Sequence, residues 1–127
     1  MTENEIAAII VDTAFHIHCD LGPGLFETVY ERVMEAELAK RGLTVFRQKP
    51  IPIVYNDLHF GAGFRADLLV DDKVIVEIKS IDALHPVHKK QVLTYLRFAD
   101  KRLGLLINFN VALIKDGIVR LVNKLRE

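Results

Sequence analysis

The segment from Arg65 to Lys79 constrains the fold of this chain most, because charged side chains interrupt two otherwise apolar runs. The apolar and β-branched residues of these runs predict a pair of β-strands over residues 64–70 and 74–80. Side chains alternate between the two faces of a strand, so Glu77 and Lys79 must emerge side by side on one face. Charged groups in a buried strand are costly unless they are paired or bind an ion, and this pair therefore marks a candidate functional site.

The length of the turn between these strands decides whether Asp67 joins the same site. With a two-residue turn at residues 71–72, Asp67 would lie opposite Val76, and Glu77 would point to the other face. With a three-residue connection over residues 71–73, or a bulge that adds one residue, Asp67 lies opposite Glu77 at a Cβ separation of about 5 Å. We predict the longer connection, which brings the two carboxylates together.

Two carboxylates at this separation suit a hard divalent cation. Asp67 and Glu77 would each supply oxygen, the main-chain carbonyl of Ile78 is a further candidate ligand, and water would complete an octahedron. Lys79, two residues after the second acid, would lean over the same position. The two carboxylates and the ammonium together would form a ready site for a hard divalent cation.

The Asp-x9-Glu-x-Lys pattern on a hairpin resembles the core motif of the PD-(D/E)xK nuclease superfamily, and further short motifs strengthen the resemblance. They occur in the expected order over about residues 5 to 122, which is nearly the whole chain. The motifs are Gly24-Leu25-Phe26-Glu27-Thr28-Val29-Tyr30, Arg65-Ala66-Asp67, Glu77-Ile78-Lys79, Pro86-Val87-His88, Gln91 with Tyr95, and Asn108-Phe109-Asn110. Because the first of these resembles the G-x-x-E-x-x-Y signature, the chain is identified as a member of the GxxExxY protein family, a branch of that superfamily.

This resemblance implies a fold, a metal and a reaction. The implied fold class is α+β with a restriction-endonuclease-like core, in which helices flank a central mixed sheet. One or two Mg2+ or Mn2+ ions would activate a water for attack on a phosphodiester bond of DNA or RNA. The implied metal ligands are Asp67, Glu77, the Ile78 carbonyl and Glu27. The implied catalytic residues are Asp67, Glu77, Lys79, Glu27 and Gln91.

The resemblance also implies roles for side chains around the ion. Lys79 would position or deprotonate the attacking water, or stabilise the developing charge. Gln91 and Tyr95 lie four residues apart on one helix face, where they can orient a water or hold a phosphate oxygen. The implied substrate-binding residues are Tyr95, Arg65, Tyr30 and Lys90.

Several of these residues have a second explanation that the sequence leaves open. Glu27 lies in the first turn of a helix, where an acid favours the helix dipole by about 0.3–1 kcal/mol. Tyr30 could instead hydrogen-bond a carboxylate or cover the core, and Tyr95 could be a half-buried core aromatic. For Arg65 we favour an ion pair with Glu27 or Glu77 over a contact with a substrate phosphate.

Hydrophobic periodicity predicts the remaining elements. Helices are expected over residues 3–19, 26–41 and 85–100, and the second of them should bury Val29, Val33, Met34, Ala36 and Leu38. Besides the motif hairpin, strands are expected over residues 43–48, 51–55 and 103–109, with a closing hairpin of residues 111–115 and 118–121. The strand over 103–109 is nearly all apolar, so it should be buried on both faces and join the acid strand in parallel through a right-handed crossover.

Length and composition limit the class of protein. A chain of 127 residues, half of them hydrophobic, predicts one domain over residues 1–127 with a core of its own. The one cysteine, Cys19, excludes an internal disulfide, and its apolar neighbours predict a buried, inert thiol. An acidic N-terminus without a long apolar run predicts a cytoplasmic protein with no membrane partner.

The charge balance limits how such a chain could bind nucleic acid. The 17 basic and 17 acidic residues cancel, so phosphate binding must rely on local patches. The candidate patches are Lys89, Lys90, Arg97, Lys101 and Arg102 around one helix, and Arg41, Arg47 and Lys49 around an earlier turn. A solvated helix face explains the first cluster equally well. Nucleic acid is the expected partner, and a homodimer or a partner protein could supply missing affinity.

Two classes of function follow from the sequence. In the first, the domain is a metal-dependent phosphodiester hydrolase, a nuclease that acts on DNA or RNA. In the second, it is a catalytically silent nuclease-fold module that binds nucleic acid, a nucleotide or a protein partner, since fold alone does not dictate function. The intact Asp67, Glu77 and Lys79 favour the enzyme, whereas the zero net charge favours the binding module.

Overall fold

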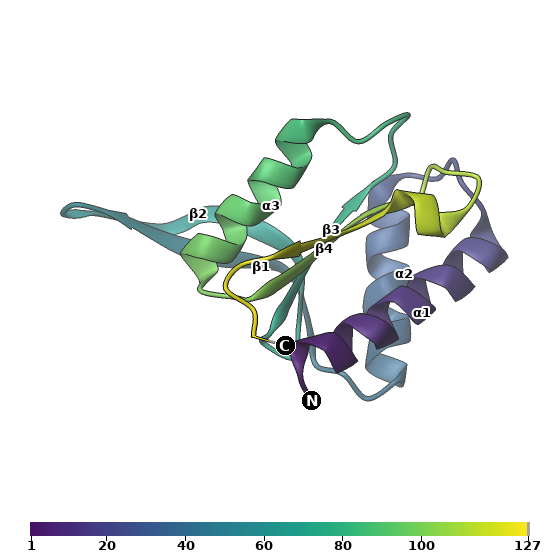
Figure 1. Ribbon diagram of the computed structural model, residues 1–127, viewed down its shortest axis with the longest axis horizontal. Helices are drawn as coiled ribbons and strands as arrows, with labels where there is room; N and C mark the ends of the chain where they lie inside the picture. Colours follow the sequence, from purple (N-terminus) through teal and green to yellow (C-terminus); the bar gives the residue numbers. More distant parts are fainter. Residues whose placement is uncertain (127) are drawn as a thin grey trace.

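A five-stranded sheet lies between helices on both of its faces (Figure 1). The computed structural model describes residues 1–126. Its elements are α1 (Glu3–Leu21), α2 (Glu27–Lys40), β1 (Val45–Tyr55), β2 (Leu58–Val70), β3 (Val74–Lys79), α3 (Pro86–Ala99), β4 (Leu103–Asn108), the 3-10 helix η1 (Ile114–Gly117) and β5 (Ile118–Val122). Among these residues, no helix is long and apolar enough to cross a membrane.

The strands follow one another across the sheet in chain order, from β1 at one edge to β5 at the other. Neighbouring strands are antiparallel except for β3 and β4, which are parallel and are connected through α3. A parallel pair requires such a crossover, because a short turn can join only antiparallel strands. The sheet is therefore mixed, and the predicted α+β class and the parallel position of β4 are confirmed.

Alternation along the strands produces an apolar core on each face of the sheet. Leu68, Val76 and Leu105 face α1 and α2, whereas Leu69 and Ile75 face α3. All residues of β4 are buried, as expected for a strand covered on both faces. The two helical layers thus cover both faces of β2, β3 and β4, and these strands carry the predicted site.

The first hairpin differs from the prediction of two separate strands over residues 43–55. β1 runs without a break through Pro50, because it is an edge strand, where proline removes no needed hydrogen bond. β2 begins six residues earlier than predicted, at Leu58 rather than Phe64. Residues 52–63 therefore form an arm that projects beyond the helices, and all but one of its residues are exposed (Figure 1).

The C-terminal segment also differs from the prediction. No hairpin forms over residues 111–121; η1 and the single strand β5 occupy this region, and β5 pairs antiparallel with β4. Asp116 and Gly117 lie in η1 rather than in a hairpin turn. Gly117 packs against the carbonyl oxygen of Asn108 so closely that a Cβ atom there would overlap it. This close approach, rather than a turn, explains the glycine.

The burial of several helix residues was predicted incorrectly from the sequence. In α2, Val29 and Ala36 are exposed, and the buried residues are Tyr30, Glu31, Met34 and Leu38. The spacing of four between Tyr30, Met34 and Leu38 defines the buried face, and it carries Glu31 into the interior. Cys19 is exposed on α1, so the expectation of a buried thiol is wrong.

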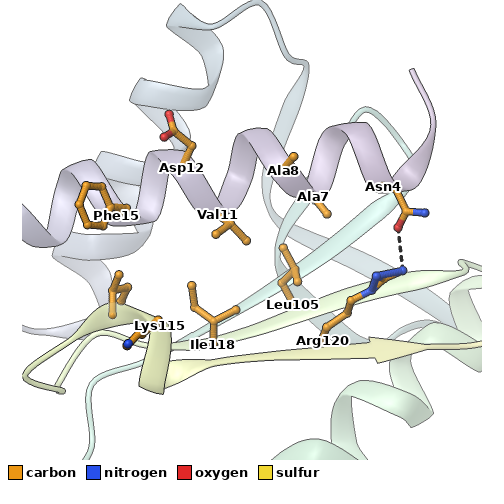
Figure 2. A pocket seen from close by; sticks show the side chains of 11 residues that line it. Asn4, Ala7, Ala8, Val11, Asp12, Phe15, Leu105, Lys115, Ile118 and Arg120 are labelled. Atoms are coloured by element: carbon orange, nitrogen blue, oxygen red, sulfur yellow. Dashed lines mark hydrogen bonds between the residues drawn. The ribbon is translucent and has the colours of Figure 1, made fainter.

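A hollow of about 740 Å³ lies between α1 and β5 (Figure 2). Val11 and Phe15 of α1 and Ile118 of β5 contribute apolar lining. Arg120 donates a hydrogen bond to Oδ1 of Asn4 at 2.7 Å beside it. None of the predicted catalytic residues lines this hollow, so it is separate from the site described next.

Candidate active site

The turn between β2 and β3 has the predicted longer form. Asp71 and Asp72 both adopt positive φ, and the N–H of Lys73 donates to the carbonyl of Val70 at 3.0 Å. Lys73 is the additional residue, because the strands pair as Val70↔Val74 and continue in this register to Leu68↔Val76. The next pair in the same register is Asp67 and Glu77, which confirms the arithmetic behind the prediction.

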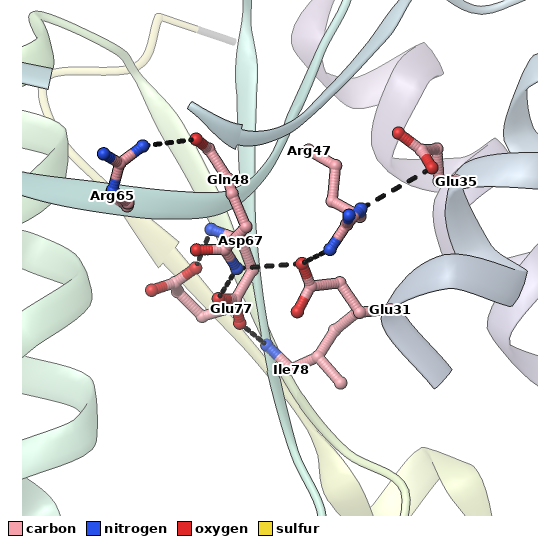
Figure 3. Close-up of polar contacts among 8 residues, drawn as sticks. All are labelled: Glu31, Glu35, Arg47, Gln48, Arg65, Asp67, Glu77 and Ile78. Carbon is pink, nitrogen blue, oxygen red and sulfur yellow. Dashed lines mark hydrogen bonds and ion pairs between the residues drawn. The ribbon is translucent and has the colours of Figure 1, made fainter. Parts of the chain in front are cut away.

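At Asp67 and Glu77 the side chains replace the main-chain ladder (Figure 3). The N–H of Asp67 donates to Oε2 of Glu77 at 2.7 Å, and the N–H of Ile78 donates to Oδ2 of Asp67 at 2.8 Å. A strand residue directs its N–H and its C=O to the same neighbouring strand, so the Ile78 carbonyl also projects toward β2. Two carboxylates and one carbonyl oxygen therefore converge where β2 and β3 separate.

Burial dominates the electrostatics of this pair. Glu77 is 7% exposed, and burial, followed by the charge of Asp67, raises its pKa from 4.5 to about 8. Burial also raises the pKa of Asp67, and the charge of Glu27 adds to this shift. Lys79 lowers the pKa of both acids, so its ammonium group acts on the same small volume. Without a cation the two carboxylates resist simultaneous ionisation.

A polar network that the sequence did not predict supports Asp67 from the other side. Gln48 lies opposite Asp67 in the register of β1 and β2, and its Nε2 donates to Oδ1 of Asp67 at 3.1 Å. The same nitrogen donates to Oε1 of Glu31 at 2.8 Å, and Arg47 approaches this oxygen at 3.4 Å (Figure 3). Gln48 has a φ of 55°, a conformation that costs a non-glycine residue about 1–3 kcal/mol. One amide thus connects the buried Glu31 with the partly buried Asp67.

Glu31 is the third acid near the site, and sequence reasoning missed it. Burial raises its pKa, and the charge of Asp67 adds to the shift, whereas Gln48 and Arg47 oppose it. The available signal was its position one turn after Glu27 on the buried face of α2. A carboxylate at such a position requires partners, and Gln48 and Arg47 provide them.

Glu27 approaches the site from the N-terminus of α2, but its carboxylate binds the main chain of Ser80 instead of joining the acid pair. Its Oε2 accepts a hydrogen bond from the N–H of Ser80 at 3.1 Å, and it lines a hollow of about 540 Å³ together with Gly24 and Asn110. Within residues 1–126, no three His, Cys, Asp or Glu side chains lie close enough together to hold an ion. The donors that fit a hard cation are therefore Asp67, Glu77 and the Ile78 carbonyl, with Glu27 nearby.

Tyr30 does not reach the substrate side of the site. Its side chain is fully buried and stacks on Phe109, with ring centroids 4.4 Å apart. Its hydroxyl donates to the carbonyl of Gly22 at 2.6 Å and accepts from the N–H of Leu25 at 3.2 Å. The assignment of Tyr30 as a substrate-binding residue is corrected: it fixes the loop before Glu27 and covers the core.

The ion pair that we favoured for Arg65 does not form. Arg65 is exposed, and its Nη1 donates to the main-chain carbonyl of Gln48 at 3.4 Å rather than to Glu27 or Glu77 (Figure 3). Glu77 is bound instead by the N–H of Asp67, and Glu27 by Ser80. The guanidinium of Arg65 therefore stays available to solvent beside the acid pair.

The α3 helix supplies the other side of the site. Tyr95 stacks on Phe64 of β2, with ring centroids 4.0 Å apart. Burial raises the pKa of Tyr95, the charges of Glu77 and Asp67 add to the shift, and Gln91 opposes it. Because the charges of Glu77 and Asp67 act on the Tyr95 hydroxyl, this hydroxyl lies near both acids. Gln91 lies one turn earlier on the same face of α3. Lys90 is exposed on α3, next to Gln91.

The comparisons with known proteins agree with this geometry. The family model described as the PD-(D/E)XK nuclease superfamily matches residues 4–121. Neither the curated proteins nor the solved structures give a match. The family match spans every element that carries the acid pair, the lysine and the two helical layers. The chain therefore belongs to the PD-(D/E)XK nuclease superfamily.

Proposed function

We propose that this chain is a metal-dependent phosphodiester hydrolase that acts on DNA or RNA, and that it belongs to the GxxExxY branch of the superfamily. The observation that carries the proposal is the pair of hydrogen bonds, from the N–H of Asp67 to Glu77 and from the N–H of Ile78 to Asp67, beside Lys79. The buried Glu77 and the partly buried Asp67 both have raised pKa values, so their ionised forms destabilise the fold, and a divalent cation would offset that cost. Such an arrangement is typical of a functional site rather than of a structural core.

The proposed ligands for Mg2+ or Mn2+ are Asp67, Glu77 and the Ile78 carbonyl, with Glu27 as a fourth candidate. When bound, the ion would lower the pKa of a water and neutralise charge on the scissile phosphate. The N–H groups of Asp67 and Ile78 orient the two carboxylates in advance, because each donates to the carboxylate on the opposite strand. Gln48 fixes the remaining oxygen of Asp67.

The other side chains would act on the substrate directly. The ammonium of Lys79 would position the attacking water or stabilise the charge that develops on the phosphate. Gln91 and Tyr95 can donate to a phosphate oxygen from α3, on the side of the site opposite Gln48. Arg65, which forms no ion pair with any described residue, would contact an adjacent phosphate.

One observation favours the silent binding module as a second candidate. Both carboxylates already accept main-chain hydrogen bonds, and Glu77, with a pKa of about 8, is largely protonated at neutral pH. A neutral acid would be a stable structural partner for the N–H of Asp67 without any ion. This candidate predicts the same fold and the same binding surface, but no cleavage.

A cleavage screen separates the two candidates. Wild type is incubated with Mg2+ or Mn2+ and with single-stranded, duplex and branched DNA and RNA, alongside Lys79→Met. The matched control is Lys40→Met, at an exposed lysine that pairs with Glu37 on α2. We expect cleavage by wild type and by the control, but none by Lys79→Met. Full activity in Lys79→Met would remove the lysine from the mechanism, and a wild type that cuts nothing would favour the silent module.

Calorimetric titration with Mn2+ tests the metal site independently of cleavage. Wild type should bind the ion and release protons, because Glu77 must lose its proton to become a ligand. Asp67→Ala should abolish binding while the circular dichroism spectrum stays unchanged. If Asp67→Ala binds Mn2+ as tightly as wild type, the ion lies elsewhere and the proposed ligand set is wrong.

A further inference from the structure

The charges of this neutral chain are separated by the sheet. The helices α1 and α2 on one face carry eight acidic and two basic residues, whereas α3 on the other face carries three basic and no acidic residues. Asp67 and Glu77 lie within the electrostatic reach of Tyr95 on α3. A polyanion that approaches the acid pair is therefore repelled by one helical layer and attracted by the other.

The basic side chains of α3 have no acidic partners. Lys89, Lys90 and Arg97 are exposed and form no ion pair with any described residue. By contrast, Lys101 pairs with Asp72 at 3.0 Å, and Arg102 pairs with Asp100 at 2.8 Å just after the helix. The three unpaired cations of α3 and the exposed Arg65 are therefore available for phosphates.

The arm adds apolar and aromatic surface to this charged face. Tyr55 and Phe60 are 67% and 49% exposed, and Leu58 beside the turn is 60% exposed. The arm begins directly beyond the pair Ile51↔Phe64, and Phe64 stacks on Tyr95 of α3. The exposed rings of the arm therefore follow directly in sequence on the Phe64–Tyr95 stack, and Tyr95 lies within the electrostatic reach of the acid pair.

We propose that the arm and the exposed side of α3 bind one strand of nucleic acid over an unpaired stretch. In this arrangement Lys89, Lys90 and Arg97 contact phosphates, and Tyr55 and Phe60 stack on bases. The inference rests on the proposed function, because it uses the acid pair as the point at which the strand is cut. A positively charged track with exposed aromatic rings is the combination that holds single strands without sequence preference.

Duplex ends and a second copy of the chain fit this surface less well. In a duplex the base faces are stacked on each other, so exposed rings on the arm would find no partner. A two-fold dimer through this surface would bring two identical α3 helices together, and their like charges would oppose association. An unpaired strand matches both the cations and the rings.

The binding test uses fluorescence anisotropy with EDTA present, so that no cleavage occurs. The probes are a labelled single strand of about 16 nucleotides and the corresponding duplex. Wild type should bind the single strand more tightly than the duplex. The double variant Tyr55→Ala/Phe60→Ala should bind the single strand at least about fivefold more weakly. The matched control Phe15→Ala removes a ring that is 51% exposed on α1 and should bind as wild type does.

Salt dependence tests the cations of α3 separately. Each phosphate contact contributes about 0.7 to the slope of log affinity against log salt for a single strand. The double variant Lys89→Ala/Lys90→Ala should therefore lower that slope by about one to one and a half. The control Arg32→Ala/Lys40→Ala removes two cations from α2, on the other face of the sheet, and should leave the slope unchanged.

The outcomes distinguish this inference from the proposed function. Hydrolysis of a small p-nitrophenyl phosphodiester, which is too short to reach the arm, reports the acid pair alone. If the arm variant hydrolyses this ester but no longer binds or cuts the single strand, the inference is supported. If wild type hydrolyses the ester and the arm variant binds the single strand normally, the inference fails and the function stands. If the arm variant changes only the sedimentation of the protein, the arm belongs to a dimer interface, and the inference is overturned.

Discussion

The raised pKa of Glu77 makes the stability of the metal-free protein depend on pH in a direction that can be calculated. The unfolded carboxyl has a pKa of 4.5 and the folded carboxyl a pKa of about 8, so between these values the folded state binds more protons. The free energy of unfolding must therefore fall as pH rises through this window. One pKa unit corresponds to about 1.4 kcal/mol, so the loss between pH 5 and pH 8 is about 4 kcal/mol.

The substitution Glu77→Gln isolates this effect. The amide oxygen of glutamine can still accept the N–H of Asp67, which donates to Glu77 at 2.7 Å, but the side chain no longer ionises. We expect the variant to be more stable than wild type at pH 8, with a much smaller slope from pH 5 to pH 8. Urea denaturation followed by circular dichroism at each pH measures both proteins, with Glu37→Gln at an exposed ion pair as control.

Metal binding should reverse the sign of this comparison. Saturating Mg2+ favours the ionised form of Glu77, so it should stabilise wild type more at pH 8 than at pH 6, and it should not stabilise Glu77→Gln. A flat stability profile for metal-free wild type, or an equally steep one for the variant, would show that Glu77 is not the buried acid that titrates. The electrostatic basis of the site would then be wrong.

Three further substitutions test the surroundings of the site. Gln48→Ala removes the amide that holds both Glu31 and Asp67, and it should lower the free energy of unfolding by about 1–3 kcal/mol in urea denaturation. Tyr30→Phe loses a donor and an acceptor to the loop before Glu27, so a loss of about 1–3 kcal/mol is expected, with faster hydrogen exchange of the Leu25 amide. Gly104→Ala places a Cβ atom 2.8 Å from Cγ1 of Val92 and should lower the free energy of unfolding by about 1–3 kcal/mol. Adding Val92→Ala should restore part of this loss. If Gly104→Ala leaves the free energy of unfolding unchanged, α3 packs more loosely against β4 than described.

The acid pair was predictable because local rules were sufficient. The alternation of side chains aligned Glu77 with Lys79, and turn arithmetic aligned Asp67 with Glu77, which the register confirms. The apolar run of β4 similarly predicted a strand buried on both faces. These features depend on neighbours in the chain or across one turn, so a single sequence contains the information.

The rest of the site depends on contacts between distant segments. Gln48 reaches Glu31 only because β1 packs beside α2, and no local pattern in either segment indicates that contact. The arm was missed because Gly61, Ala62 and Gly63 lack strand propensity, although the strand continues through them. The prediction of a closing hairpin was wrong because the Asp116-Gly117 sequence is typical of a hairpin turn. In the structure, the glycine is needed because the backbone there lies too close to the carbonyl of Asn108 for a Cβ atom.

The additional residue at Lys73 gives an exposed turn control over the chemistry of residues buried some distance away. If the turn closed with residues 71–72 alone, Lys73 would enter the strand opposite Val70, and Asp67 would face Val76 while Glu77 turned to the opposite layer. Insertions and deletions are ordinarily best tolerated at such surface loops. Here, by contrast, a change in how the turn closes, at residues outside every ligand, would shift the register and be as damaging as removal of a ligand itself.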